Sequence, residues 1–473
     1  MVQKGKYLMG FNCIFHEFRT LEDNLGLFNL KIKGVNVWDL VRFQVFEKII
    51  REKGVFESRP VKVVKHEHGK SPKEKIRPIE WLLKSPIFQG RKDFYFFSAA
   101  SSFRRNGGDN KAWDIYFDHL IDSIGPESCL LIESLDTADS NPHTKNVMYT
   151  NLLDGVIRRF GCSLFRVKFS DFEVELLDGI DAEIQKMFCV RANFPSMVSS
   201  AISYHLTNLF FYKKLLLIKS PKAVFLISSY GREYLIDACR QLSIPVIEIQ
   251  HGVISPFHLG YSYPEGGKKV LFPDYFLTMG KYWEKSIRFP IDDVNIITLG
   301  APYISSEMHG VRKGKKNILF VSQWSVGTKL SLFAMELSLR LGKEYNLYYK
   351  LHPCEYDTWR DRYPYLEQAN INVVQNDDVS LSELFSECAF QVGVYSTAVF
   401  QGIAMGCKTY LVNLPGVEHM NDLVKIGIVK LVDHPSQVDF DAEFNNGVGS
   451  DYFFAESWGL NMANFIRRLG LNN

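Results

Sequence analysis

The sequence predicts an α/β protein with two domains, each built on a parallel sheet, and a mixed N-terminal extension. Short apolar runs of strand length alternate with segments of helical periodicity, which is the pattern of βαβ units. The alternation occurs twice and is interrupted by a polar, basic, glycine-containing passage at residues 308–316. A chain of 473 residues has room for two or three domains of ~100–200 residues each.

These breaks divide the chain into four predicted parts. Residues 1–88 form the extension, 89–312 the first Rossmann-like domain, 313–450 the second, and 451–473 a helix that crosses back to the first domain. The two domains are expected to face each other across a cleft.

Within the extension, residues 37–46 place apolar side chains at helical spacing, and Gly54 supplies a stop signal. This helix either packs inside the protein or, with its flanking lysines and arginines, contacts a membrane surface. Residues 62–78 are expected to form a basic polar loop.

The expected elements follow in chain order. The first domain has predicted strands at 92–100, 128–134, 223–229, 245–250, 275–279 and 294–300, and predicted helices at 109–124, 190–220 and 232–242. The second domain has predicted strands at 317–323, 346–352, 371–374, 390–395 and 408–413, and predicted helices at 330–341, 381–387 and 398–405. Gly402 and Gly406 are expected to allow close helix–strand packing and a tight exit from the last helix.

Charge and cysteine content argue against several classes of protein. Lys and Arg number 55 against 53 Asp and Glu, so the net charge of +2 does not indicate a nucleic-acid partner. The 8 cysteines include no C-x-x-C pair, which argues against a zinc site or a secreted disulfide scaffold. We expect no signal peptide and no membrane-spanning run of ~18–20 apolar residues. A cytoplasmic protein is expected, and peripheral membrane contact stays open.

Polar residues at the strand ends of the second domain form the first half of the candidate site, because ligands of such sheets bind beyond the carboxyl ends of the strands. His352 follows the second strand and is fixed by Pro353. A protonated imidazole there can donate to a phosphate oxygen. A solvated loop histidine is the alternative.

Small polar residues follow two other strands of this domain. Ser322 and Gln323 end the first strand, and Ser396-Thr397 follow the strand at 390–395 and open a helix. Hydroxyls and free backbone N–H groups at a helix start can bind a phosphate, whereas an ordinary N-cap is the alternative.

The first domain supplies the other half of the candidate site. His251 follows the strand at 245–250 and is a candidate general base, or a histidine satisfied by a backbone carbonyl. Glu133 is a rival base, as is Asp136. A loop after the strand at 92–100 carries further candidates for a sugar carboxylate or phosphate, unless they are surface residues: Arg104, Arg105 and Asp109.

No metal or further cofactor is expected. No D-x-D stands at a strand end; Asp439-Phe440-Asp441, Asp377-Asp378 and Asp292-Asp293 read as loop acids or helix caps. The sequence contains neither a G-x-G-x-x-G dinucleotide fingerprint nor a P-loop.

The motif KLHP (350–353), followed by VYSTAVFQGIAMG (394–406), resembles the HP and Ser/Thr motifs of bacterial transferases that use CMP-activated sugars. These include sialyltransferases, Kdo transferases and nonulosonic acid transferases, and residues 92–470 resemble their GT-B class. The resemblance implies that His352 and Ser396-Thr397 contact the cytidine monophosphate. CDP-glycerol and CDP-ribitol phosphotransferases share a similar arrangement, in which QHG (250–252) would supply the base His251. The acidic pair followed by glycine that normally carries the sialyltransferase base has no clear counterpart here, which leaves the base in question.

The expected function is therefore metal-independent transfer of a sugar. The favoured donor is a nonulosonic acid or Kdo in its CMP-activated form. The expected acceptor is a glycan or lipid-linked glycan of the bacterial surface, such as capsule or lipopolysaccharide. The stretch GVNVWDLVRF (34–43) also resembles polysaccharide assembly proteins, so contact with such proteins or with the inner membrane is conceivable. The alternatives are a CDP-alditol phosphotransferase, a transferase using an NDP-hexose, a UDP-GlcNAc epimerase and a non-catalytic glycan-binding protein.

Overall fold

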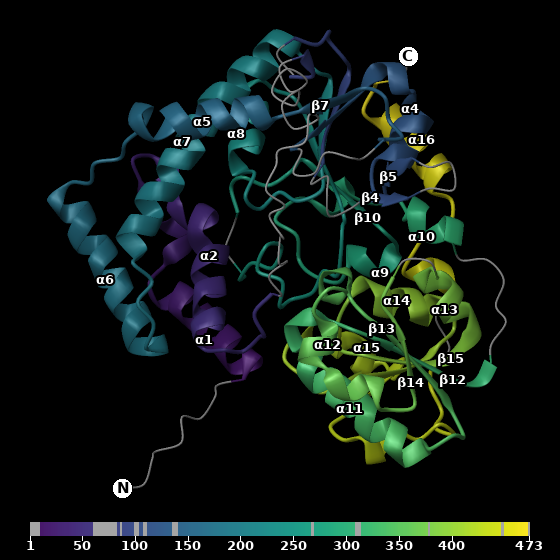
Figure 1. Cartoon of the computed structure of the whole chain (residues 1–473). Helices are drawn as coiled ribbons and strands as arrows, with labels where there is room; N and C mark the ends of the chain where they lie inside the picture. The colour runs from purple at the N-terminus through teal and green to yellow at the C-terminus, as the bar shows by residue number, and fades with distance from the viewer. Residues whose placement is uncertain are drawn as a thin grey trace, which may run out of the picture.

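Two parallel sheets organise the chain (Figure 1). The computed structural model describes residues 10–59, 83–85, 88–98, 104–106, 111–134, 141–265, 269–307, 314–376, 379–445 and 449–471. The expected basic loop at 62–78 and most of the domain boundary at 308–316 lie outside these residues. No helix in the described part of the chain is long and apolar enough to cross a membrane.

The first domain contains a seven-stranded sheet with the order β11-β10-β9-β8-β3-β6-β7, and every neighbouring pair is parallel. Its strands are β3 (Phe94–Phe97), β6 (Cys129–Glu133), β7 (Val147–Tyr149), β8 (Ala223–Leu226), β9 (Val246–Ile249), β10 (Tyr275–Thr278) and β11 (Ile296–Thr298). The chain starts at β3, builds outward to β7, and then returns to place β8 on the other side of β3. This reversal creates a switch point between β3 and β8.

The second domain repeats this plan with a six-stranded parallel sheet of order β14-β13-β12-β15-β16-β17. Its strands are β12 (Gly314–Val321), β13 (Asn346–Lys350), β14 (Ile371–Val374), β15 (Cys388–Gly393), β16 (Lys408–Val412) and β17 (Val429–Val432). In chain order the arrangement is 3-2-1-4-5-6, with its switch point between β12 and β15. The predicted class of two Rossmann-like domains is confirmed, and each expected strand forms.

Helices cover both faces of each sheet (Figure 1). In the first domain and the extension they are α1 (Phe11–Asn24), α2 (Val37–Glu52), α4 (Asp118–Ile124), α5 (Asn151–Leu164), α6 (Asp171–Phe188), α7 (Phe194–Lys219), α8 (Glu233–Gln241), α9 (Lys281–Glu284) and α10 (Pro302–Glu307). The second domain and the tail contain α11 (Gly327–Leu341), α12 (Trp359–Arg362), α13 (Leu381–Glu387), α14 (Thr397–Ala404), α15 (Asn421–Lys425) and α16 (Trp458–Arg468).

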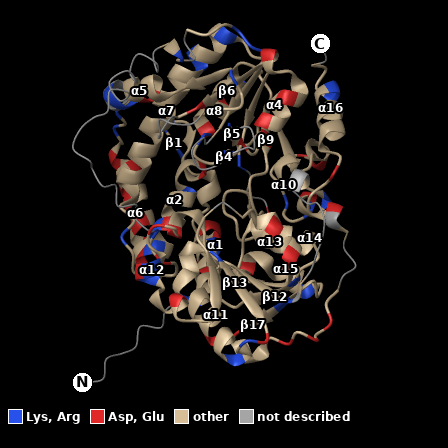
Figure 2. Cartoon of the chain, turned by 45° about the vertical axis from the view of Figure 1, so that its right-hand side comes forward, with Lys and Arg blue, Asp and Glu red and all other residues tan. Residues whose placement is uncertain are grey.

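Two small antiparallel strand pairs lie outside the main sheets. They are β1 (Lys31–Ile32) with β2 (Val35–Asn36), and β4 (Arg104–Asn106) with β5 (Ala112–Asp114). Acidic and basic residues are interspersed over both domains (Figure 2).

The extension is a helical module that packs on the first domain. Helices α1 and α2 bury their apolar faces against α6 and α7 in one hydrophobic cluster. Arg42 of α2 is also buried; it pairs with Glu22 of α1 and donates to the carbonyl oxygens of Leu259 and Ser262, 2.7 Å away in each case. The helix at 37–52 therefore packs inside the protein, and most of its apolar side chains are not available to a membrane.

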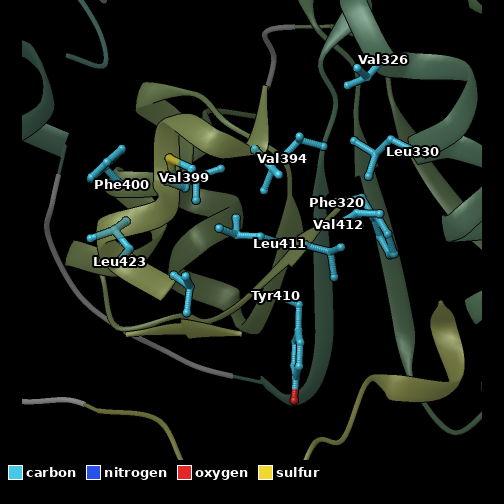
Figure 3. Packing of buried hydrophobic residues seen from close by; sticks show 14 of the residues in the cluster. Phe320, Val326, Leu330, Val394, Val399, Phe400, Tyr410, Leu411, Val412 and Leu423 are labelled. Atoms are coloured by element: carbon cyan, nitrogen blue, oxygen red, sulfur yellow. The ribbon is translucent and has the colours of Figure 1, made fainter. Parts of the chain in front are cut away.

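The largest hydrophobic cluster joins the two domains. In the second domain it fills the space between the sheet and its helices with residues such as Phe320, Leu330 and Phe400 (Figure 3). Across the boundary, Trp283 packs against Phe400 with ring centroids 4.5 Å apart. The C-terminal helix α16 packs beside α4 (Figure 1), and its Met462 and Phe465 are buried in the core of the first domain.

One predicted helix is partly wrong. The segment 109–124 was expected to be helical throughout, but residues 112–114 form strand β5 and α4 begins only at Asp118. The Asp114 carboxylate accepts hydrogen bonds from the backbone N–H groups of Tyr116 and Phe117. Such local side-chain bonds compete with helix formation.

Gly402 and Gly406 behave as expected. A methyl group at Gly402 would overlap the Gln391 side chain of β15, so only glycine lets α14 approach this strand so closely. Gly406 has a φ of +79°, which places it in the left-handed region that ends α14 tightly.

Candidate active site

The end of β13 is organised by a buried glutamate. His352 caps a short 3-10 helix, Pro353–Glu355, and its backbone N–H donates to Glu355 Oε2 at 2.9 Å. The same oxygen accepts from Ser322 Oγ of the neighbouring strand end at 2.7 Å, and Glu355 Oε1 accepts from the Tyr363 hydroxyl at 2.6 Å. Glu355 therefore ties the ends of β12 and β13 together and fixes the backbone on which His352 sits.

The His352 imidazole has one nitrogen engaged inside its own turn. Nδ1 accepts from the Cys354 backbone N–H at 3.2 Å, so the neutral ring carries its proton on Nε2. Burial, together with the positive charges of Arg59 and Arg105, lowers the pKa of His352 to about 4. The ring is thus neutral at pH 7, contrary to the expected imidazolium, and it offers an Nε2–H donor. Arg59 from the extension and Arg105 from the first domain give this strand end a positive potential.

A His-Pro pair alone does not identify a ligand site, because the chain contains a second His-Pro pair with the same local geometry. His434 precedes Pro435 after the edge strand β17, and its Nδ1 accepts from the Ser436 N–H at 3.2 Å. In both places the pair starts a 3-10 helix with a capping box. His352 differs in its position next to the switch point, and in the charges that surround it.

The other strand ends at this switch point have different roles. Gln323 follows β12, and its Oε1 accepts from the Tyr395 N–H at 3.3 Å. Ser396 caps α14 by accepting from the Val399 N–H at 3.4 Å, and Thr397 is the first residue of that helix. The buried Ser322 hydroxyl is occupied by Glu355. Strand spacing places the His352 and Ser396 strand ends roughly 10 Å apart, with Gln323 between them.

The two sheets meet at their carboxyl ends. A Cβ at Gly252, after β9, would lie 3.6 Å from Thr397 Oγ1, which is van der Waals contact. Nearby, Ser255 Oγ and His419 Nδ1 lie 2.7 Å apart across the same domain boundary. The loop that carries His251 therefore touches the helix start that carries Ser396 and Thr397.

His251 is held by two tyrosines and by a hydrogen bond with the Ile227 backbone, which is the contact that the alternative of a backbone-satisfied histidine expects. Its Nε2 lies 3.2 Å from the Tyr230 hydroxyl, and its Nδ1 lies 3.4 Å from the Tyr261 hydroxyl. Tyr261 in turn donates to the fully buried Glu248. Burial lowers the pKa of His251 to about 4, and burial raises the pKa of Glu248 to about 7. Glu248, Tyr261 and His251 form a chain of hydrogen-bonding groups in which the imidazole is neutral at pH 7.

Glu133 and Arg104 form an ion pair with each other. Arg104 Nη2 lies 2.7 Å from Glu133 Oε2, both side chains are almost fully buried, and Arg104 Nη1 donates to the Ala112 carbonyl. The positive charge of Arg104 is therefore neutralised internally. Arg105 is only partly buried and reaches the His352 side of the site. Asp109 and Asp136 lie outside the described residues.

Two of the three acidic pairs lie in described segments away from the strand ends discussed above. Asp439 and Asp441 flank Phe440 beyond β17, Asp292 and Asp293 precede β11, and residues 377–378 are outside the described part of the chain. Among the described residues, no cluster of three or more His, Cys, Asp or Glu side chains is placed to hold a metal ion.

Sequence reasoning missed Glu355, Glu248 and the tyrosines around His251. A signal for Glu355 was present, because a cap residue followed three positions later by Glu is a capping-box pattern. Glu248 was also visible as a lone charge inside the apolar strand VIEI. The tyrosine contacts depend on tertiary packing and have no local signal.

The histidines predict a loss of stability in acid. Burial lowers the pKa of His258 to about 3, assisted by His419 and His251. A group whose pKa is lower in the folded state stabilises the fold above its unfolded pKa of 6.5, and this contribution is lost as the pH falls from 6.5 through about 3. At pH 5 the loss for His258 is up to about 2 kcal/mol. Glu248, whose pKa is raised, acts in the opposite direction, losing stability as the pH rises from 4.5 through 7.

Thermal unfolding at pH 7 and pH 5 measures this effect. We expect the drop in Tm between the two pH values to be smaller in His258→Gln than in the wild type, since all other titrating groups are shared. Equal drops in the two proteins would show that His258 is not buried in its neutral form.

No family model matches the sequence, and no curated protein matches it. Among solved structures, UDP-GlcNAc 2-epimerase from Methanocaldococcus jannaschii in complex with UDP-GlcNAc and UDP aligns with a TM-score of 0.46 at 10% identity, covering 81% of this chain and 100% of that chain. The Neisseria meningitidis UDP-GlcNAc 2-epimerase bound to UDP-GlcNAc gives 0.43 at 14% identity, covering 80% and 99%. Acinetobacter baumannii MurG gives 0.41 at 12% identity, covering 80% and 99%. The strand orders, rather than these distant similarities, define the fold.

Proposed function

We propose that the chain is a glycosyltransferase that uses a nucleotide-activated sugar, best a CMP-activated nonulosonic acid or Kdo, and a bacterial surface glycan as acceptor. The meeting of the two sheets at their carboxyl ends, with Gly252 against Thr397, is the observation that carries this proposal. It places a histidine of each domain at the sheet edges where such folds bind ligands.

The donor nucleotide lies along the carboxyl edge of the second sheet, across β13, β12 and β15. His352 Nε2–H donates to the phosphate, and the start of α14 with Ser396 and Thr397 binds the rest of the nucleotide monophosphate. The positive charges of Arg59 and Arg105 attract the anionic donor. These groups supply positive potential without a metal ion.

His251 is the proposed general base on the acceptor side, and Glu133 is disfavoured because its carboxylate is paired with Arg104. The acceptor hydroxyl donates to His251 Nε2 in place of the Tyr230 O–H group, which turns about its C–O bond while the ring stays packed, and attacks the anomeric carbon. The bond between that carbon and the CMP oxygen breaks, the electron pair leaves with CMP, and the acceptor proton passes to His251. Glu248, through Tyr261, stabilises the imidazolium that forms.

Incubation with CMP-, UDP- and GDP-sugars and a lipid-linked or oligosaccharide acceptor, followed by mass spectrometry, tests the proposal. The expected product is the acceptor plus one sugar residue, with release of CMP. Addition of a phosphoalditol from a CDP-alditol would instead show a phosphotransferase, and conversion of UDP-GlcNAc without an acceptor would show an epimerase. Either result, or transfer from a UDP- or GDP-sugar alone, overturns the proposed donor.

A further inference from the structure

A pocket lies between the helical extension and the first domain. It has a cavity volume of about 140 Å³ and is lined by α2 and by the segments that follow β8 and β9. Residues of α2 at its wall include Arg42, Phe43 and Gln44, and the first domain contributes Tyr230, Tyr263 and Lys269.

The charged groups of this pocket are neutralised by the protein itself. Arg42 is paired with Glu22 and lies between the rings of Phe28 and Tyr263, 5.1 and 5.0 Å from their centroids. The buried Lys269 ammonium lies 3.1 Å from Glu233. With both cations paired, the pocket has no reason to favour a carboxylate or phosphate over an uncharged molecule.

Three of the residues that line the pocket are aromatic: Phe43, Tyr230 and Tyr263. Phe43 is 40% exposed and stacks on Tyr230, with ring centroids 5.4 Å apart and an interplanar angle of 22°. The exposed Gln44 amide stands beside Phe43 and can both donate and accept hydrogen bonds. Aromatic faces combined with polar edges match the alternating C–H faces and hydroxyl edges of a pyranose.

One side chain, Tyr230, separates the pocket from the proposed base His251. Tyr230 lines the pocket, and its hydroxyl lies 3.2 Å from His251 Nε2. Gly260 lies against the Tyr230 ring, since a Cβ there would be 2.6 Å from Tyr230 Cδ1. Tyr230 is therefore held in place by its packing, between the pocket and His251.

We propose that this pocket binds an uncharged saccharide unit of the acceptor, and that α2 of the extension forms its outer wall. The inference rests on the proposed function, because it places the acceptor next to the base of that reaction. It assigns a binding role to the extension, whose Trp38 and Arg42 anchor α2 to Glu22.

Saturation-transfer-difference NMR on the full chain tests the inference without donor or turnover. The probes are maltotriose, chitotriose and lactotetraose as uncharged oligosaccharides, and 3′-sialyllactose and trigalacturonate as anionic ones. We expect saturation of at least one uncharged probe, and a weaker signal from the anionic ones. Phe43→Ala should weaken binding about tenfold, the effect of losing one aromatic contact.

The control is Phe172→Ala, which removes an equally large, 74% exposed ring from α6 outside the pocket and should leave binding unchanged. Gln44→Ala is a second pocket variant at an exposed position and should also weaken binding. Absence of signal for every uncharged probe, stronger binding of the anionic probes, or undiminished binding by both pocket variants would overturn the inference. Nucleotide binding, measured separately, should be the same in Phe43→Ala and wild type, so failure of the donor site and failure of this pocket are distinguishable.

Discussion

Replacement of His352 by alanine is expected to lower the rate of sugar transfer by about 10²–10³-fold, the usual effect of losing one donor to a developing negative charge. The imidazole accepts from the Cys354 N–H through Nδ1, which leaves Nε2–H to stabilise the departing phosphate. Steady-state rates with saturating acceptor and a CMP-sugar measure the effect.

His434→Ala provides a matched control for this variant. It removes an imidazole from the same kind of His-Pro capping box, but after the edge strand β17. Its transfer rate should equal that of the wild type. If His352→Ala retained the wild-type rate with every CMP-sugar tried, the assignment of the leaving phosphate to His352 would be wrong.

Replacement of Glu355 by alanine is expected to destabilise the fold by about 3 kcal/mol. The carboxylate is fully buried and accepts from the His352 N–H, the Ser322 hydroxyl and the Tyr363 hydroxyl. Its removal leaves three buried donors without this acceptor. Denaturant unfolding measures the change, and Glu355→Gln, which keeps one oxygen, should lose less.

Glu367→Ala is the control for the glutamate variant. Glu367 lies on the surface and pairs with Arg360 at 2.8 Å, so its loss should cost less than 1 kcal/mol. An unfolding midpoint of Glu355→Ala close to that of Glu367→Ala would contradict the structural role of Glu355. The nucleotide affinity of Glu355→Ala should also fall, because the backbone of His352 is no longer fixed.

The strands and their ends could be predicted because parallel strands are buried on both faces. Runs such as FYFF at 94–97 and ILFV at 318–321 are continuously apolar, and the polar residues that follow them mark the carboxyl edge. His251, His352 and Ser396 were found in this way.

The partners of these residues could not be predicted, because they depend on which strands become neighbours. Glu355 can tie two strand ends together only because β12 lies beside β13, which brings the Ser322 hydroxyl to its carboxylate. Arg104 was a candidate ligand for an anion, yet the pairing of β3 with β6 places Glu133 next to it. A sequence shows that an arginine is present, but not which carboxylate neutralises it.

The hairpin at 104–114 shows a second limit of sequence reasoning. The segment 112–117 has apolar residues at spacings compatible with a helix, but the Asp114 carboxylate accepts from the backbone N–H groups of Tyr116 and Phe117, which a helix that starts at residue 109 would have bonded to the carbonyls of residues 112 and 113.

Nucleotide binding to the wild-type protein is the most direct test of the central claim, that the carboxyl edge of the second sheet binds an activated sugar through its nucleotide monophosphate. Thermal unfolding is measured with CMP, CDP, UDP, GDP and ADP, since a ligand that binds the folded state raises Tm in proportion to RT ln(1 + [L]/Kd). The account predicts the largest increase with CMP in the wild type and in His434→Ala, and a much smaller one in His352→Ala. A preference for UDP or GDP, no shift with any nucleotide, or an equal CMP shift in His352→Ala would contradict it.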